Sequence, residues 1–191
     1  MECFVGIDLA GSPKNPTGWA CLQGNSVKTR ELFSDEEILL ETFKVKPNVV
    51  AIDAPLTIPI NGMTRKADRD MHRYGYPVLP PLYPAMKALT YRGIALTQKI
   101  LEGRIEVIEV HPTSTRKALS MPIKDWEEIQ RILVEMGIQV SEEPLTSHQI
   151  DAVTAALTAY FHIKGEEEKI GDSVEGYIIV PKKKPWREVQ L

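Results

Sequence analysis

Hydrophobic positions in this chain fall mainly into short unbroken runs, the pattern of strands buried on both faces of a sheet. The runs predict strands at Cys3–Leu9, Thr17–Leu22, Ser26–Leu32, Asn48–Asp53 and Ile105–Val110. Short turn-forming segments separate the first three, so we expect an antiparallel meander there. A further apolar run, Tyr177–Val180, is compatible with an edge strand or a packed tail.

Longer stretches with helical periodicity follow the meander and alternate with the later strands. They predict helices over Asp35–Lys44, Thr64–Tyr74, Ala85–Glu102 and Trp126–Met136, and a last one that begins after Thr146. Ser34 with Glu37, and Thr146 with Gln149, have the spacing of capping boxes. This order predicts a three-layer α/β fold, in which helices flank a five-stranded mixed sheet of three antiparallel strands followed by parallel ones.

Length and composition limit the classes of protein to consider. The 191 residues favour a single domain over residues 1–181, with a helical and loop insertion at about 54–104 and a basic tail at 182–191. A net charge of −3 argues against a protein that coats nucleic acid by charge alone. The two cysteines have no metal-binding spacing, and no apolar run is long enough to span a membrane. We therefore expect a cytoplasmic protein with no membrane partner.

Two carboxylates stand at the ends of buried strands, Asp8 on the first and Asp53 on the fourth. If these strands are parallel neighbours, both side chains reach the carboxyl edge, where open α/β sheets bind ligands. Two like charges that close need a divalent cation or a shared proton. Either aspartate alone could equally cap the loop that comes after it. The pair together predicts a functional site.

Two further acids are candidates for the same site. Asp151 lies one helical turn after His148 and shares its helix face, although the helix dipole alone would also stabilise an acid there. Glu109 ends the fifth strand, and the register of that strand decides whether Glu109 or Glu106 faces the site.

Clustered carboxylates without cysteine favour Mg²⁺ or Mn²⁺ over zinc. Two such ions can activate water and stabilise the leaving oxygen of a phosphodiester. In this scheme Asp8 bridges the two ions, Asp53 and Glu109 hold one of them, and Asp151 holds the other. His148 would assist proton transfer or orient Asp151.

Basic side chains near the second predicted helix and after the fifth strand are candidates for contact with backbone phosphates. They are Arg65, Lys66, Arg69, Arg73, Arg116 and Lys117. The interleaved Asp68 and Asp70 are equally compatible with a solvated, salt-bridged helix. These residues therefore predict a nucleic-acid contact less strongly than the aspartates predict a metal site.

Several motifs together resemble a known family. They are VGIDLAGSPKNPTGWA, AIDAPL, TRKADRD, EVHPTSTRKAL and HQIDAVTAALTA. As a set they resemble domain of unknown function 429, a family described as predicted nucleases with an RNase H-like fold, over about Val5 to Pro181. The helix with His148 and Asp151 also resembles that of the Holliday-junction resolvases. The resemblance implies a metal-dependent nuclease that acts on DNA or RNA, with Asp8, Asp53, Asp151 and Glu109 as the metal ligands.

Two other classes of function remain open. An actin-like ATPase or phosphotransferase also carries an aspartate at the end of its first strand, here in Asp8-Leu9-Ala10-Gly11-Ser12. The glycine comes one position late for that motif, however, and the actin-like clamp needs two copies of the fold, which this chain would supply only as a homodimer. The other alternative is a binding module that kept the fold without the chemistry. Metal binding that depends on the aspartates would separate a nuclease from such a module.

Overall fold

The predicted meander forms the first part of the sheet. In the computed structural model, which describes residues 2–140 and 143–189, β1 (Cys3–Asp8) pairs antiparallel with β2 (Thr17–Gln23), and β2 pairs antiparallel with β3 (Ser26–Leu32). The expected parallel part comes next, because β4 (Val49–Asp53) pairs with β1 and β5 (Glu106–Val110) pairs with β4. The mixed α/β character predicted from the hydrophobic pattern is therefore confirmed.

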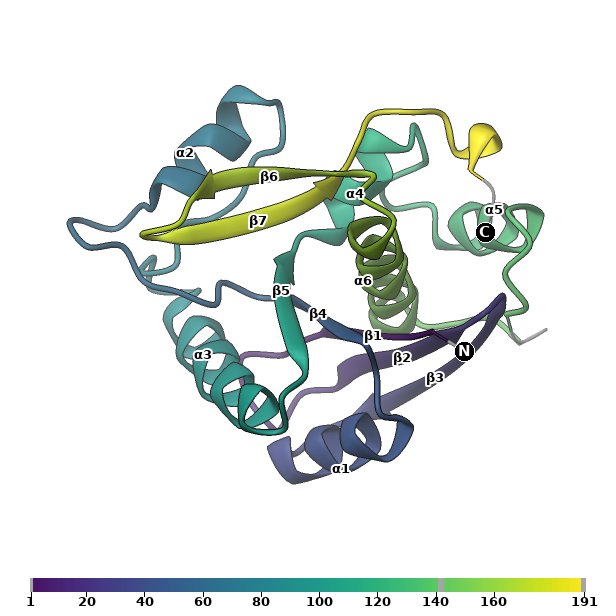
Figure 1. The fold of residues 1–191 in the computed structure, drawn as a ribbon, viewed down its shortest axis with the longest axis horizontal. Coiled ribbons are helices and arrows are strands. Elements are labelled where there is room, and N and C mark those ends of the chain that lie inside the picture. The colour runs from purple at the N-terminus through teal and green to yellow at the C-terminus, as the bar shows by residue number, and fades with distance from the viewer. Residues whose placement is uncertain (1, 141–142, 190–191) are drawn as a thin grey trace.

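The sheet formed by the described residues has seven strands, so the prediction of five was wrong. The apolar run near the C-terminus is an inner strand, β7 (Gly176–Pro181), parallel to β5, and β6 (Glu167–Asp172) pairs with it at the edge. The strand order is β3-β2-β1-β4-β5-β7-β6 (Figure 1). The hydrophobic pattern missed β6 because Ile170 is the one fully buried residue among its six.

Five helices lie close to their predicted positions. They are α1 (Asp35–Val45), α2 (Lys66–Arg73), α3 (Lys87–Glu102), α5 (Trp126–Glu135) and α6 (Ser147–Ile163). The sequence pattern did not predict a short helix, α4 (Pro112–Ala118), because a proline after a strand is usually read only as the end of that strand. Proline is also well suited to the first position of a helix, where its missing N–H would have no partner anyway. None of the helices in the described part of the chain is long and apolar enough to cross a membrane.

The helices form two layers around the sheet, with α6 on one face and α1 and α3 on the other (Figure 1). Phe4 and Ala51 pack toward α6, whereas Val5 and Ile52 pack toward α1 and α3. Since side chains alternate along a strand, the even positions of β1 and the odd positions of β4 face α6. Asp8 and Asp53 therefore face the same layer.

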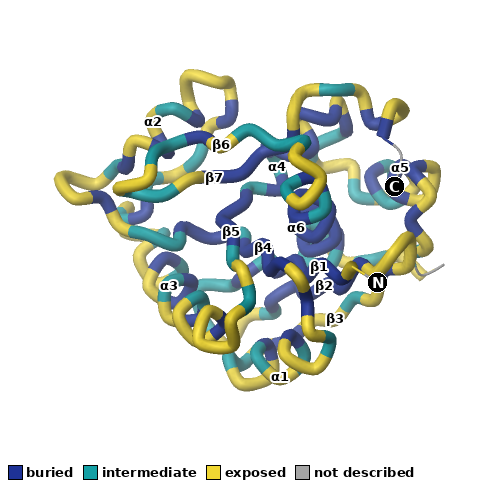
Figure 2. Tube along the Cα trace, in the orientation of Figure 1, coloured by how far each residue is buried: buried dark blue, intermediate teal, exposed yellow. Residues whose placement is uncertain are grey.

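Two glycines let α6 lie unusually close to the sheet. A Cβ at Gly6 would be 2.0 Å from the Ala152 carbonyl oxygen, and one at Gly18 would be 1.9 Å from the His148 carbonyl oxygen. Buried residues line α6 along most of its length (Figure 2). Because Gly18 pairs with Asp8 in the β1–β2 register, this contact brings the first turn of α6 to the end of β1.

The segment expected as a basic tail packs against the domain over its described part. The Lys184 amide donates to the Ala118 carbonyl, and the Trp186 amide donates to the Leu119 carbonyl. A single 3₁₀ turn, Trp186–Glu188, buries the Trp186 side chain in the hydrophobic cluster on the α6 side of the sheet. Residues 190 and 191 of the expected tail, and residues 1, 141 and 142 of the expected domain, lie outside the described residues.

Candidate active site

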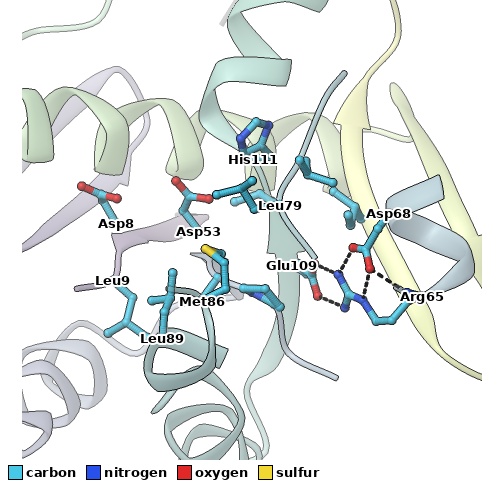
Figure 3. A pocket seen from close by; sticks show the side chains of 15 residues that line it. Asp8, Leu9, Asp53, Arg65, Asp68, Leu79, Met86, Leu89, Glu109 and His111 are labelled. Carbon is cyan, nitrogen blue, oxygen red and sulfur yellow. Dashed lines mark hydrogen bonds and ion pairs between the residues drawn. The ribbon is translucent and has the colours of Figure 1, made fainter. Parts of the chain in front are cut away.

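The two strand-end aspartates lie opposite each other. Asp8 and Asp53 are register partners at the last positions of β1 and β4, and these strands are parallel neighbours, which is the condition on which the expected meeting of the two carboxylates depended. Adjacent strands in a sheet are about 4.8 Å apart, so the two side chains leave neighbouring points on the same face of the sheet. Both line a cavity at the carboxyl edge (Figure 3).

Burial makes the ionised form of both aspartates unfavourable. Loss of hydration raises the pKa of Asp8 to about 6, and the charge of Asp151 adds to this rise, while the hydrogen bond to His148 opposes it. The pKa of Asp53 is raised well above its usual value by burial and by the charges of Asp8 and Asp151. No hydrogen bond or ion pair joins the Asp53 carboxylate to another described residue. A cation from outside the chain would therefore stabilise the pair.

His148 contacts Asp8. Its Nδ1 lies 2.7 Å from Asp8 Oδ2, so the ring orients this carboxylate and not that of Asp151, which the sequence had suggested as its partner. The contact results from the close approach of α6 at Gly18, which places the His148 backbone over β2.

Asp151 already has a cation within the protein. The Arg116 guanidinium, from α4, forms an ion pair with the Asp151 carboxylate and lies 5.4 Å from the centre of the Trp126 ring. The side chain of Arg116 is only 1% exposed. Arg116 is therefore placed to neutralise Asp151 and not to meet a phosphate at the surface.

Glu109 is also occupied by an arginine. It is the register partner of Ile52, so it points to the opposite face of the sheet from Asp53. Its two carboxylate oxygens accept hydrogen bonds of 2.6 and 2.7 Å from Arg65, and Oε2 also accepts one of 2.8 Å from the Leu56 amide. Arg65 bonds Asp68 as well, which completes a buried cluster (Figure 3). Burial raises the pKa of Glu109, and Arg65 counteracts this rise.

The alternative glutamate is not near the aspartate pair. Glu106 begins β5, at the other end of the strand from the cavity, and its carboxylate contacts His162 Nε2 at 2.9 Å. Glu106 therefore lies outside the site, whereas Glu109 lines the same cavity as Asp8 and Asp53 but projects from the other face of the sheet.

The other predicted phosphate contacts remain at the surface. Lys66 and Arg73 pair with Asp70, Arg69 donates to the Thr64 carbonyl, and Lys117 donates to the Gly75 carbonyl. All four are exposed. Arg65 and Arg116, by contrast, are buried.

The cavity over the aspartates has a volume of about 240 Å³ and an unexpected histidine among its lining residues. His111 comes directly after β5, and its Nδ1 lies 2.7 Å from Ser114 Oγ. Burial lowers the pKa of His111 to about 4, and the charges of Arg116 and Lys117 add to this effect. The signal available in the sequence was its place immediately after a buried strand, the same signal that identified Asp8 and Asp53.

Part of the cavity wall is apolar. Leu79 and Met86 come from the proline-rich segment between α2 and α3, and Leu89 comes from α3 (Figure 3). Within residues 2–140 and 143–189, no three or more His, Cys, Asp or Glu side chains are grouped so that they could hold a metal ion by themselves. Any ion at this site would thus need further ligands from water or substrate.

Comparison with known structures shows that the fold of this chain is similar to that of RuvC chains. The chain has a TM-score of 0.51 with Thermus thermophilus RuvC in complex with a Holliday junction substrate, at 16% identity, covering 86% of this chain and 96% of that one. A second T. thermophilus RuvC structure has a TM-score of 0.46 at 19% identity and covers 85% of this chain and 96% of that one. The first of these likenesses supports the RNase H-like fold expected from the motifs.

A sequence comparison gives the family. The pattern of the family described as "Protein of unknown function (DUF429)" matches residues 6–175, and the chain belongs to this family. The resemblance seen in the sequence motifs is therefore confirmed. No curated protein matches the chain.

Proposed function

We propose that this chain is a nuclease that hydrolyses phosphodiester bonds in nucleic acid with a divalent cation, Mg²⁺ or Mn²⁺, held by Asp8 and Asp53. The observation that carries the proposal is the pairing of these aspartates across neighbouring parallel strands, on one face and at one edge. Two ionised carboxylates in this position repel each other. A divalent cation offsets that repulsion and is suited to carboxylate ligands.

The side chains fit one cation better than the two considered from the sequence. Asp151 is paired with Arg116, and Glu109 is paired with Arg65 on the other face of the sheet. Arg116 thus offsets one of the three aspartate charges, and two negative charges remain. This balance matches a single divalent ion whose other ligands are water and a phosphate oxygen of the substrate.

A bound ion would supply an activated water and would polarise the phosphoryl group. Two histidines of the chain would assist at this site. His148 contacts Asp8 Oδ2 through Nδ1 and so orients this carboxylate. His111 lines the cavity and is neutral at pH 7, because its pKa is lowered to about 4, so it can serve there as a hydrogen-bond partner for substrate or water.

The comparisons support a nucleic-acid substrate only through the fold. A RuvC chain of the same fold was solved with a Holliday junction substrate. On this chain, the exposed Lys66, Arg69, Arg73 and Lys117 are the remaining candidates for contact with phosphates. The homodimer and the cytoplasmic location expected from the sequence stay predictions.

Calorimetric titration with Mn²⁺ tests the metal site. The wild-type chain should bind one ion, whereas Asp8→Asn and Asp53→Asn should each abolish binding and the Mn²⁺-dependent cleavage of a labelled oligonucleotide. Glu106→Gln is a matched control, because it removes an acid from the same sheet at the end away from the cavity. It should bind and cleave as the wild type does.

Three results would contradict the proposal. Full metal-dependent cleavage by Asp8→Asn would refute the role of the aspartate pair. Absence of Mn²⁺ binding at millimolar concentration, with and without oligonucleotide, would favour a non-catalytic binding module. Two ions per chain would show that Asp151 or Glu109 exchanges its arginine for metal, contrary to the single-ion site.

A further inference from the structure

The lining of the cavity at the aspartate pair is partly acidic and partly apolar. Asp8 and Asp53 contribute carboxylates, and Leu79, Met86 and Leu89 contribute an apolar part of the wall (Figure 3). The side chain of Leu79 is 55% exposed although it lines the cavity, so it stands at the cavity mouth. A substrate whose phosphate reaches the aspartates would therefore place its neighbouring group against hydrocarbon.

The two buried arginines near the aspartate pair are not available to a polyanion. Arg65, which lines the cavity, is held by Glu109 and Asp68, and Arg116 is held by Asp151. Both are buried. A base-paired duplex presents phosphates, sugars and groove edges, while stacking hides the faces of its bases. The cavity thus lacks the free cations that would suit a duplex and has an apolar wall that a duplex cannot use.

An unpaired nucleotide has the complementary chemistry. Its base exposes two flat faces that pack well on apolar side chains, and enzymes that act on single nucleotides hold the base in such pockets. The volume of about 240 Å³ is below the roughly 300–1,000 Å³ of pockets that enclose drug-sized ligands. A single base is a group of suitable size.

We propose that the site accepts one unpaired nucleotide of a single strand, with its base against Leu79, Met86 and Leu89 and its phosphate at Asp8 and Asp53. This inference rests on the proposed nuclease function and names its substrate class. It separates the chain from an enzyme for duplexes or four-way junctions, because the apolar wall contributes to binding only when a base leaves its stack.

The test compares Mn²⁺-dependent cleavage of one labelled strand presented alone, in a blunt duplex and in a four-way junction. The single strand should be cleaved at least about tenfold faster than either paired form. Leu79→Ser should raise the KM for the single strand about fivefold with little change in kcat, because it removes apolar contact and leaves the aspartates in place. Leu79→Met should restore the wild-type KM.

Ile60→Ser is the control, since Ile60 is a similarly exposed aliphatic residue (66%) of the same insertion that does not line this cavity. It should leave the KM unchanged. Equal or faster cleavage of the duplex or junction, or a KM that does not respond to Leu79→Ser, would overturn the inference and leave the nuclease function intact. Cleavage of none of the three substrates would instead refute the proposed function itself, and the inference with it.

Discussion

Replacing Arg65 by methionine probes the buried ion cluster beside the cavity. The Arg65 side chain is 1% exposed and bonds both oxygens of Glu109, both oxygens of Asp68 and the Thr57 hydroxyl. Methionine fills similar space without a charge or a donor. In Arg65→Met, the buried carboxylates of Glu109 and Asp68 would therefore lose the cation that they share.

Removing one partner of a buried ion pair costs about 3–5 kcal/mol, because the other charge stays buried without compensation. One guanidinium serves two carboxylates here, so we expect a loss in the upper part of that range, about 4–5 kcal/mol. Protonation of Glu109 limits the loss, since burial already raises its pKa. For a chain of 191 residues this corresponds to a fall in Tm of about 8–20 °C.

Urea unfolding followed by tryptophan fluorescence measures this loss. Arg131→Met is the matched control: Arg131 also pairs with two carboxylates, Glu128 and Glu135, but its side chain is 54% exposed. Exposed pairs contribute about 0–1 kcal/mol, so the control should be nearly neutral. The double variant Arg65→Met/Glu109→Gln should recover part of the loss. A cost for Arg65→Met no larger than that of the control would refute the reasoning.

Three further outcomes are expected from the packing and charges around the aspartates. Gly6→Ala should destabilise the fold by about 1–3 kcal/mol or more in urea unfolding, because its methyl would lie 2.0 Å from the Ala152 carbonyl oxygen; a loss below about 0.5 kcal/mol would contradict the close packing of α6. The pKa of His111 is lowered from 6.5 to about 4, so between these pH values the unfolded chain binds more protons than the folded chain. The free energy of unfolding should therefore fall by up to about 3 kcal/mol as the pH drops from 6.5 to about 4. His111→Asn should remove that share of the acid sensitivity, and identical pH profiles of the two proteins would disprove it. Asp8→Asn should raise the Tm in EDTA at pH 7.5, since the pKa of Asp8 is raised to about 6 and its charge disfavours the folded state above that pH. The gain in Tm should disappear near pH 4, where Asp8 is protonated in the folded chain. A lower Tm of the variant at both pH values would contradict this reasoning.

Local patterns in the sequence were sufficient for most elements. Ser34 with Glu37, and Thr146 with Gln149, form the capping boxes that their spacing predicted at the starts of α1 and α6. The apolar runs of β1 and β4 end where Asp8 and Asp53 were expected to stand. Such features depend on neighbours within a few residues, so the order of residues alone determines them.

Other elements depended on partners far away in the chain. β6 is a strand because it pairs with β7, and its residues carry little apolar pattern of their own. α4 begins at Pro112, and a proline can either end one element or start the next, depending on the contacts of its neighbours. The sequence was ambiguous at both places because the deciding contacts form only in the folded chain.

The same distinction applies to the candidate site. The order of residues was enough to predict that Asp8 and Asp53 end buried strands, but only the folded sheet makes those strands parallel neighbours. Folding alone determines that Glu109 faces away from Asp53 and bonds Arg65, and that Asp151 is paired with Arg116. Alternation of side chains along one strand does not tell which face of the sheet packs against which layer of helices. In addition, an arginine on another element can neutralise an acid from which it is far apart in the sequence. The choice between a carboxylate that binds metal and one that serves the fold is therefore made by long-range packing.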